Sequence, residues 1–146
     1  MRVVYHGRRR QEDEPHIYYD DLTDMARDAD WLVVVAPGGK ATEKLVSRQV
    51  LEALGPEGML VNMARGTVVD EAALVELLAS GGLGGAALDV FEKEPQVPAG
   101  LFALDNVVLS PHQGSSTHRT RRIMGELLVA NLDAHFAGEP LPSAVV

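Results

Sequence analysis

Short apolar runs alternate along the chain with segments whose apolar residues recur at helical spacing. The run WLVVVAP at 31–37 is rich in β-branched residues and ends at a proline, which predicts a strand buried on both faces of a parallel sheet. Similar runs predict strands at 2–7, 17–19, 59–63, 85–91 and 106–110. Helical spacing predicts helices at 21–30, 42–46, 47–54, 70–80 and 115–137. Because strands that alternate with helices form βαβ units, the pattern predicts a parallel α/β sheet with right-handed crossovers.

Two of the predicted helices carry further signals. Asp70 is suited to cap the helix that follows it, because an aspartate side chain accepts hydrogen bonds from the first helical turn. The helix near 115–137 is the longest, and its apolar side chains form one stripe: Ile123, Met124, Leu127, Leu128, Leu132 and Phe136. Such a stripe predicts a helix that packs along its length.

Composition and charge narrow the class of protein. The 146 residues are 46% hydrophobic and 23% charged, as expected of a globular chain that buries a core. The formal net charge of -8 argues against a nucleic-acid or anionic-membrane surface. The lack of cysteine excludes disulfides, thiolate metal sites and a cysteine nucleophile, and we expect no metal. No apolar run reaches membrane-spanning length and no signal peptide is recognisable, so we expect a cytoplasmic protein.

Polar residues interrupt the apolar pattern at the predicted strand ends. Arg65, Asp89 and His112 each stand at or just after the end of a strand, and Pro37 ends another. Because the carboxyl ends of parallel strands meet at one edge of the sheet, where open α/β sheets bind ligands, we expect these residues to share a site. A cation, acids and an imidazole at one edge suit a small anionic carbonyl compound.

Three longer motifs occur in a fixed order: NMARGTVVDEAAL (62–74), GGAALDVFEKEP (84–95) and DNVVLSPHQGSST (105–117). Together they closely resemble the signature of the D-isomer-specific 2-hydroxyacid dehydrogenases. VYHGRRR (4–10) and VVVAPGGKATEKLV (33–46) look most like the glyoxylate/hydroxypyruvate reductase branch of that family. The resemblance implies an oxidoreductase that transfers a hydride between NADP(H) and a small 2-oxo or 2-hydroxy acid.

The resemblance also assigns the catalytic roles. Arg65 matches the arginine that grips the substrate carboxylate and polarises its carbonyl, a task that suits a planar guanidinium with a permanent charge. His112 matches the proton donor, and Glu94 the acid that hydrogen-bonds the far ring nitrogen. Glu92 lies in the same loop and periodicity does not separate the two acids. The family places its acid immediately before the proline, which favours Glu94.

Further matches concern the cofactor. The residues expected to line it are Gly7, Arg8, Arg9, Pro37, Met63, Ala64, Arg65, Asp89, His112, Gly114 and Ser115. Asp89 matches the contact to the nicotinamide carboxamide, although it is also suited to cap a backbone turn.

The arginine run after the first predicted strand bears on the choice of cofactor. At this place an acid binds the ribose 2′-hydroxyl of NAD, whereas arginine accommodates the 2′-phosphate of NADP. Gly7 is followed directly by Arg8 and Arg9, with no acid at the strand end. We therefore expect NADP, with NAD possible; a solvated charge cluster is the alternative interpretation.

One departure from the family pattern is large. The G-x-G-x-x-G turn that cradles the pyrophosphate is absent, and the chain opens on what looks like the strand after that turn and its helix. The expected fold is therefore a doubly wound, Rossmann-like parallel sheet that lacks the first strand, the glycine turn and the first helix. In the strand order 3-2-1-4-5-6, the missing strand is the central one. We expect a C-terminal fragment that is inactive alone.

The resulting organisation has two parts and two functional hypotheses. Residues 1–114 are expected to form a partial NAD(P)-binding domain, and 115–146 a helix and tail that, in the family, return toward a substrate domain. The family implies a homodimer. The alternative to an enzyme is a non-catalytic remnant that acts as a binding or oligomerisation module through its last helix.

Overall fold

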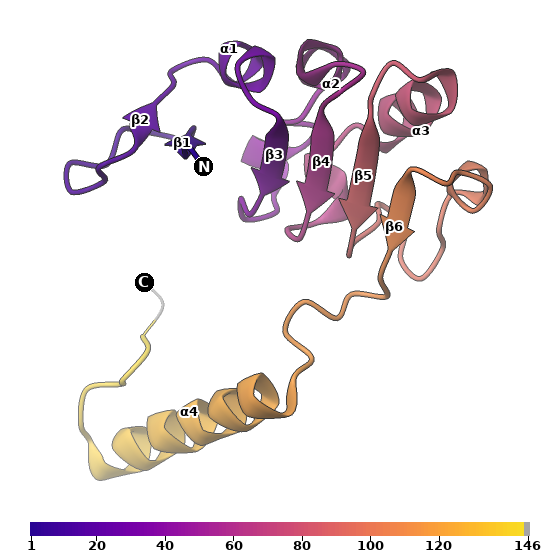
Figure 1. Cartoon of the computed structure of the whole chain (residues 1–146). Helices are drawn as coiled ribbons and strands as arrows, with labels where there is room; N and C mark the ends of the chain where they lie inside the picture. Colours follow the sequence, from indigo (N-terminus) through magenta and orange to yellow (C-terminus); the bar gives the residue numbers. More distant parts are fainter. Residues whose placement is uncertain (145–146) are drawn as a thin grey trace. The chain divides into compact units, whose positions relative to one another are not determined.

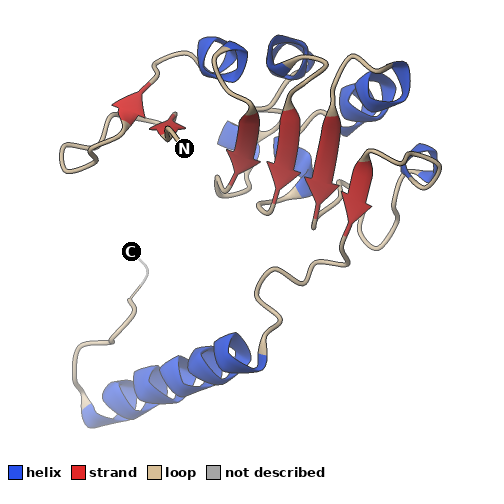
Figure 2. Ribbon diagram, in the orientation of Figure 1, coloured by secondary structure: helices blue, strands red, loops and turns tan. Residues whose placement is uncertain are grey.

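Two parallel β-sheets organise the computed structural model, which describes residues 1–144 (Figures 1 and 2). β1 (Val4–Tyr5) pairs with β2 (Ile17–Tyr18) in a two-stranded sheet. The larger sheet has the order β3-β4-β5-β6, formed by Trp31–Val34, Met59–Asn62, Gly85–Leu88 and Val107–Leu109. All pairs in both sheets are parallel, so the predicted α/β architecture is confirmed.

The two sheets fit the predicted strand order with its centre missing. β2 and β1 correspond to the third and second strands of the order 3-2-1-4-5-6, and β3 begins the run that follows the first strand. Within residues 1–144, no strand lies between β1 and β3 to form hydrogen bonds with both of them. Each of these two strands therefore presents an edge whose backbone groups lack a strand partner.

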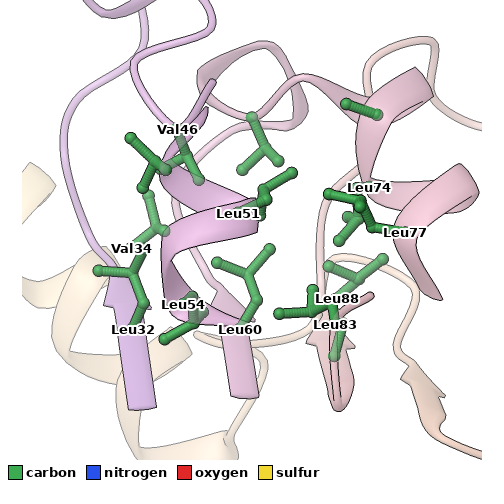
Figure 3. Packing of buried hydrophobic residues seen from close by; sticks show 14 of the residues in the cluster. Leu32, Val34, Val46, Leu51, Leu54, Leu60, Leu74, Leu77, Leu83 and Leu88 are labelled. Carbon is green, nitrogen blue, oxygen red and sulfur yellow. The ribbon is translucent and has the colours of Figure 1, made fainter. Parts of the chain in front are cut away.

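Helices α1 (Leu22–Arg27), α2 (Arg48–Leu54) and α3 (Glu71–Ser80) bury one face of the larger sheet. Alternate residues of β3 and β4 point into this core, where Leu32, Val34 and Leu60 meet Leu51 and Leu54 of α2 (Figure 3). Residues of α3 close the other side of the same core: Ala73, Leu74, Leu77 and Leu78. The core thus fixes the strands whose carboxyl ends carry the candidate site.

The cap predicted for α3 is present. The Asp70 carboxylate accepts a hydrogen bond from the backbone N–H of Ala73 at 3.3 Å, and Gly81 ends the helix with a left-handed conformation at φ 76°. The start of this helix is therefore fixed by its own side chain.

The helix predicted at 42–46 is wrong. The structure has a short 3-10 turn, η1 (Lys40–Thr42), after which the chain is extended at Glu43 and positive in φ at Lys44. The reason is a long-range pairing: the N–H groups of Lys44 and Val46 donate to the carbonyls of 67 and 68, and Val46 bridges Val69. These bonds replace the ones a helix would have made.

The prediction that β3 is buried on both faces is also wrong. Trp31 is 56% exposed and Val33 53% exposed, whereas Leu32 and Val34 between them are buried. Helices α1, α2 and α3 cover the face to which Leu32 and Val34 point, and within residues 1–112 no helix layer covers Trp31 and Val33 on the opposite face.

The second compact unit begins at Gln113 and contains α4 (His118–Ala137). The helix starts three residues later than predicted because the Thr117 hydroxyl caps it, accepting a hydrogen bond from the N–H of Thr120 at 3.1 Å. Packing along its length was predicted and is not observed: the apolar stripe from Ile123 to Phe136 is exposed, and Ala134 alone of the helix is buried. Among the residues described, no helix is both long and apolar enough to cross a bilayer.

Candidate active site

The ends of β4, β5 and β6 are tied together beyond the strands themselves. The N–H of Asp89, just after β5, donates to the carbonyl of Asn62 at 3.0 Å, and the N–H of His112 donates to the carbonyl of Asp89 at 2.9 Å. These bonds place Arg65, Asp89 and His112 along one carboxyl edge of the sheet, within the first compact unit. The edge predicted from the polar residues is thus built by consecutive parallel strands.

Glu94 and His112 form the closest pair of titratable groups at this edge. His112 Nδ1 lies 2.8 Å from Glu94 Oε2, and a carboxylate in this position accepts a hydrogen bond from the Nδ1–H group. The His112 backbone has φ 54°, an uncommon value for a residue with a side chain, and the imidazole is 46% exposed. With Nδ1 held by Glu94, Nε2 is the nitrogen left to face a ligand.

The Glu94 carboxylate is itself held in place. Its second oxygen, Oε1, accepts the backbone N–H of Phe91 at 3.1 Å. The hydrogen bond from His112 and then that from Phe91 lower the pKa of the Glu94 carboxyl below its ordinary value, and the charge of Arg65 acts in the same direction. Glu94 is therefore ionised in the range where an imidazole exchanges its proton.

Glu92, the competing acid, takes a different position. Among the hydrogen bonds and ion pairs of the described residues, none joins Glu92 to His112. The backbone N–H of Glu92 donates to Glu71 Oε2 at 2.9 Å. The structure thus separates the two acids that the sequence pattern left together, and brings Glu94 to the imidazole.

Arg65 stands on a turn shaped by a buried amide. Asn62 is 2% exposed; its Oδ1 accepts the N–H of Ala64 at 3.0 Å and its Nδ2 donates to the carbonyl of Arg65 at 3.2 Å. The Arg65 guanidinium donates to the carbonyl of Ala64 at 2.6 Å, and the residue is exposed. Asn62 was not among the predicted site residues, although a polar residue inside the apolar run MLVNM is a signal that points to it.

Gly66 allows the turn that carries Arg65 to pack against the loop that carries Glu94. A Cβ at this position would lie 1.9 Å from the carbonyl carbon of Phe91 and 2.2 Å from the backbone nitrogen of Glu92. Both obstacles are backbone, so a side chain at 66 requires the turn and the loop to move apart. Arg65 and Glu94 therefore keep their spacing through a direct backbone contact.

Replacing Gly66 with alanine should destabilise the chain. We expect a loss of about 1–3 kcal/mol in the free energy of unfolding, the usual cost of forcing extra volume into a packed site, measured by urea denaturation. Gly125→Ala is the matched control, because a Cβ at this position of α4 meets nothing within 4 Å. Alanine is the better helix former, so the control is expected to be neutral or slightly stabilising. Equal stability of the two variants would show that the contact at Gly66 is not tight.

Three of the residues predicted to line the cofactor border a cavity of about 540 Å³. Gly7 and Arg8 line it after β1, and Pro37 lines it after β3. Arg9 lies beside Arg8 in a smaller hollow, and both arginines are exposed. Among the ion pairs of the described residues, neither arginine takes part, so both charges are open to an anion.

The residues that could hold a dinucleotide lie in two groups. Arg8 and Pro37 line the cavity after β1 and β3, whereas Arg65, Asp89 and His112 follow β4, β5 and β6. Within residues 1–144, no glycine turn stands between a strand and helix to receive a pyrophosphate, because no strand lies between β1 and β3.

The remaining predicted residues divide between buried and exposed positions. Asp89 is buried, and both of its interpretations, cofactor contact and turn cap, stay open. Ala64 is buried and Met63 is exposed. Gly114 and Ser115 belong to the second compact unit, and their contact with a cofactor stays a prediction.

Comparison with known proteins identifies the family. Residues 1–114 match the family described as D-isomer specific 2-hydroxyacid dehydrogenase, NAD binding domain. The chain belongs to this family. The resemblance found in the three sequence motifs is therefore confirmed, and the parallel sheet is that of a 2-hydroxyacid dehydrogenase NAD-binding domain.

Several family members match nearly the whole chain. It is 50% identical over 99% of its length to a glyoxylate/hydroxypyruvate reductase A of Arabidopsis thaliana and 48% identical to a hydroxyphenylpyruvate reductase of Plectranthus scutellarioides. A crystal structure of the NADPH-dependent glyoxylate/hydroxypyruvate reductase of Sinorhizobium meliloti, in complex with NADP and malonate, matches with a TM-score of 0.94 and 44% identity over 99% of the chain.

This 2-hydroxyacid dehydrogenase chain spans less than half the length of these relatives. It covers 46% of each of the two plant reductases and 46% of the Sinorhizobium meliloti chain, and it matches their C-terminal part. The relatives therefore have a further N-terminal part that the described residues do not contain.

Proposed function

We propose that this chain supplies the catalytic residues of an oxidoreductase that transfers a hydride between NADP(H) and a small 2-oxo or 2-hydroxy acid of the glyoxylate or hydroxypyruvate type. The observation that carries the proposal is the His112–Glu94 pair at 2.8 Å, on the same sheet edge as Arg65. The similarity to glyoxylate/hydroxypyruvate reductases supports the substrate class.

Arg65 would bind the substrate. Its guanidinium presents parallel N–H donors that match the two oxygens of a carboxylate, and its charge persists at every working pH. The same charge draws electron density from the neighbouring carbonyl of a 2-oxo acid. The Asn62 bonds to the turn hold this guanidinium on a fixed base at the end of β4.

His112 would supply the proton. NADPH, when bound, supplies the hydride to the carbonyl carbon. The carbonyl oxygen then gains negative charge, and a proton on Nε2 of His112 neutralises it. Glu94, ionised and bonded to Nδ1, fixes the orientation of the ring and leaves Nε2 as the nitrogen that transfers the proton. In the reverse direction, the same pair accepts the proton of the 2-hydroxy acid.

The cofactor contacts of this chain are part of the same proposal. Arg8 and Arg9 would bind the 2′-phosphate of NADP beside Gly7, with NAD as the alternative cofactor. Pro37 and Met63 would line the bound dinucleotide, together with Ala64, Asp89, Gly114 and Ser115. The Sinorhizobium meliloti relative was crystallised with NADP, which supports this choice.

A fusion protein tests the activity. The 146-residue chain is joined behind the N-terminal part of the Sinorhizobium meliloti reductase that it does not match; we call this fusion the reconstituted enzyme. It is expected to oxidise NADPH when glyoxylate or hydroxypyruvate is added. A folded fusion that binds NADPH and reduces neither acid would contradict the proposed function.

Cofactor choice provides a second prediction. Replacing Arg8 and Arg9 of the reconstituted enzyme with serine should weaken NADPH binding far more than NADH binding, because only NADPH carries the 2′-phosphate. Each charge-assisted contact is worth roughly 1.5–3 kcal/mol, or about tenfold or more in Kd. Binding of the two cofactors is measured by fluorescence titration.

Arg27→Ser is the matched control, since Arg27 pairs with Asp24 on α1 at 2.5 Å. It is expected to leave both dissociation constants unchanged. Equal losses for NADPH and NADH in the Arg8/Arg9 variant would identify the run as a solvated charge cluster.

A non-catalytic binding or oligomerisation module is the second candidate function. The exposed stripe on α4, which includes Leu128 and Phe136, favours it. The presence of Arg65, Glu94 and His112 favours the enzyme, because a remnant has no physical need for that group.

The proposal includes three points that rest on the sequence and the family resemblance. We propose a partial NAD(P)-binding domain over 1–114 followed by a helix and tail over 115–146. We also propose a homodimer and a cytoplasmic location.

A further inference from the structure

The loop between β5 and Pro95 is held from outside by one side chain. Glu71, the first residue of α3, accepts the backbone N–H of Glu92 through Oε2 at 2.9 Å. The preceding N–H, that of Phe91, donates to Glu94 Oε1 at 3.1 Å. Two adjacent peptide groups therefore bind two carboxylates, one from α3 and one from the loop itself.

We propose that Glu71 is a positioning residue: its carboxylate fixes the loop so that Glu94 reaches His112. The proposal rests on the proposed function, since it assigns a role to Glu71 in the same reaction. Glu71 acts through Glu94 and is not placed in contact with substrate or cofactor.

Glu71 stands on a helix that is well fixed in the structure. Helix α3 buries Leu74 and Leu78 in the core, and Asp70 caps its first turn. A carboxylate on the first helical residue is also favoured by the helix dipole. The hydrogen bond from Glu92 to Glu71 thus anchors the loop to a helix that is packed in the core.

The same segment of chain carries the substrate arginine. Gly66 lies against the backbone of Phe91 and Glu92 so closely that a Cβ would not fit. Glu71 binds the same stretch of loop from five residues further along. The loop is therefore held at two points by residues 66–71, which follow directly after Arg65, and this sets the spacing between Arg65 and the Glu94–His112 pair.

The state of Glu94 reports whether this arrangement is intact. The charged groups that act on its carboxylate are His112 after β6 and Arg65 after β4. Hydrogen bonds from His112 and Phe91 lower the pKa of Glu94. If Glu71 releases the loop, both bonds lengthen and the pKa of Glu94 rises toward its ordinary value.

Two conservative variants separate the hydrogen bond from the charge. Glu71→Gln keeps the length of the side chain and an accepting oxygen but removes the charge. Glu71→Asp keeps the charge at the helix start but is one methylene too short to reach Glu92. Glu76→Asp is the matched control, because Glu76 is on the same helix and pairs with Arg48 instead of the loop.

The Glu94 carboxyl carbon is titrated by NMR in the reconstituted enzyme and its variants, a measurement that does not depend on turnover. Glu71→Asp should raise the pKa of Glu94, while Glu71→Gln and Glu76→Asp leave it as in the unmodified chain. An unchanged pKa in Glu71→Asp would overturn the proposal. So would an equal rise in Glu71→Gln, which would assign the effect to charge, or in Glu76→Asp, which would assign it to the helix as a whole.

Kinetics of the reconstituted enzyme give the second readout. Glu71→Asp should lower kcat by about 10-fold to 10²-fold, as expected for a displaced reacting group, with little change in KM for the 2-oxo acid. The acid limb of its pH profile should move to higher pH, because Glu94 then gains its proton earlier as pH falls. In Glu71→Gln, kcat and the acid limb of the pH profile should both stay as in the unmodified enzyme. An inactive reconstituted enzyme would refute the proposed function, while the NMR titration would still decide the role of Glu71.

Discussion

Replacing His112 with alanine in the reconstituted enzyme should lower kcat by about 10²-fold to 10⁴-fold, the usual worth of a positioned general acid. The variant loses the imidazole whose Nδ1 lies 2.8 Å from Glu94 and whose Nε2 is the proposed proton donor. Steady-state NADPH oxidation measures the loss. Dissociation constants for NADPH should change little, because proton transfer contributes to the transition state and not to cofactor binding.

Two further variants define what the His112 result means. Glu94→Gln leaves the imidazole in place and removes the carboxylate that orients it, so a smaller loss is expected. His16→Ala is the matched control, since His16 Nε2 pairs with Glu14 Oε1 at 3.7 Å and lies outside the candidate site. A His112→Ala enzyme with the turnover of the His16→Ala control would remove His112 from the mechanism.

The strands of the larger sheet followed directly from the sequence. Apolar runs such as MLVNM and GAALDVF have few ways to be buried other than as neighbouring parallel strands, and β4 and β5 pair in register. The Asp70 cap was predicted for the same reason, because a local hydrogen bond depends only on residues close in the chain. The local sequence pattern therefore predicts an element when its hydrogen-bond partner is near in sequence, or when any apolar layer can bury it.

Elements that depend on distant partners were not predicted. The segment 42–46 has helical spacing, yet Val46 pairs with Val69 instead. Trp31 and Val33 are apolar, yet within residues 1–112 no helix layer covers them. Whether an apolar residue is buried depends on the tertiary contacts around it. The pattern of a single segment does not specify those contacts.

The candidate site divides in the same way. Arg65 and His112 were found because polar residues at strand ends stand out from apolar runs. The choice of Glu94 over Glu92 came from the resemblance, and the structure supplies its geometry through the 2.8 Å contact. Asn62 and Glu71 escaped notice because each acts through hydrogen bonds to backbone groups, which a sequence does not display.

The isolated 146-residue chain should show negligible reductase activity and weak or absent NADPH binding. No glycine turn among its described residues receives a pyrophosphate, which normally rests at a helix N-terminus. The edges of β1 and β3 lack strand partners, and Trp31 and Val33 are exposed beside one of them. Open edges and apolar surface promote association, so sedimentation velocity should show oligomers that grow with concentration.

The rate of NADPH oxidation in the presence of glyoxylate tests the central claim most directly. It is measured at equal concentrations of the isolated chain, the N-terminal part of the Sinorhizobium meliloti reductase and the reconstituted enzyme. We expect turnover by the reconstituted enzyme alone, lowered by about 10²-fold to 10⁴-fold in its His112→Ala variant. Turnover by the isolated chain, or a reconstituted enzyme that folds and binds NADPH but does not reduce glyoxylate or hydroxypyruvate, would contradict it.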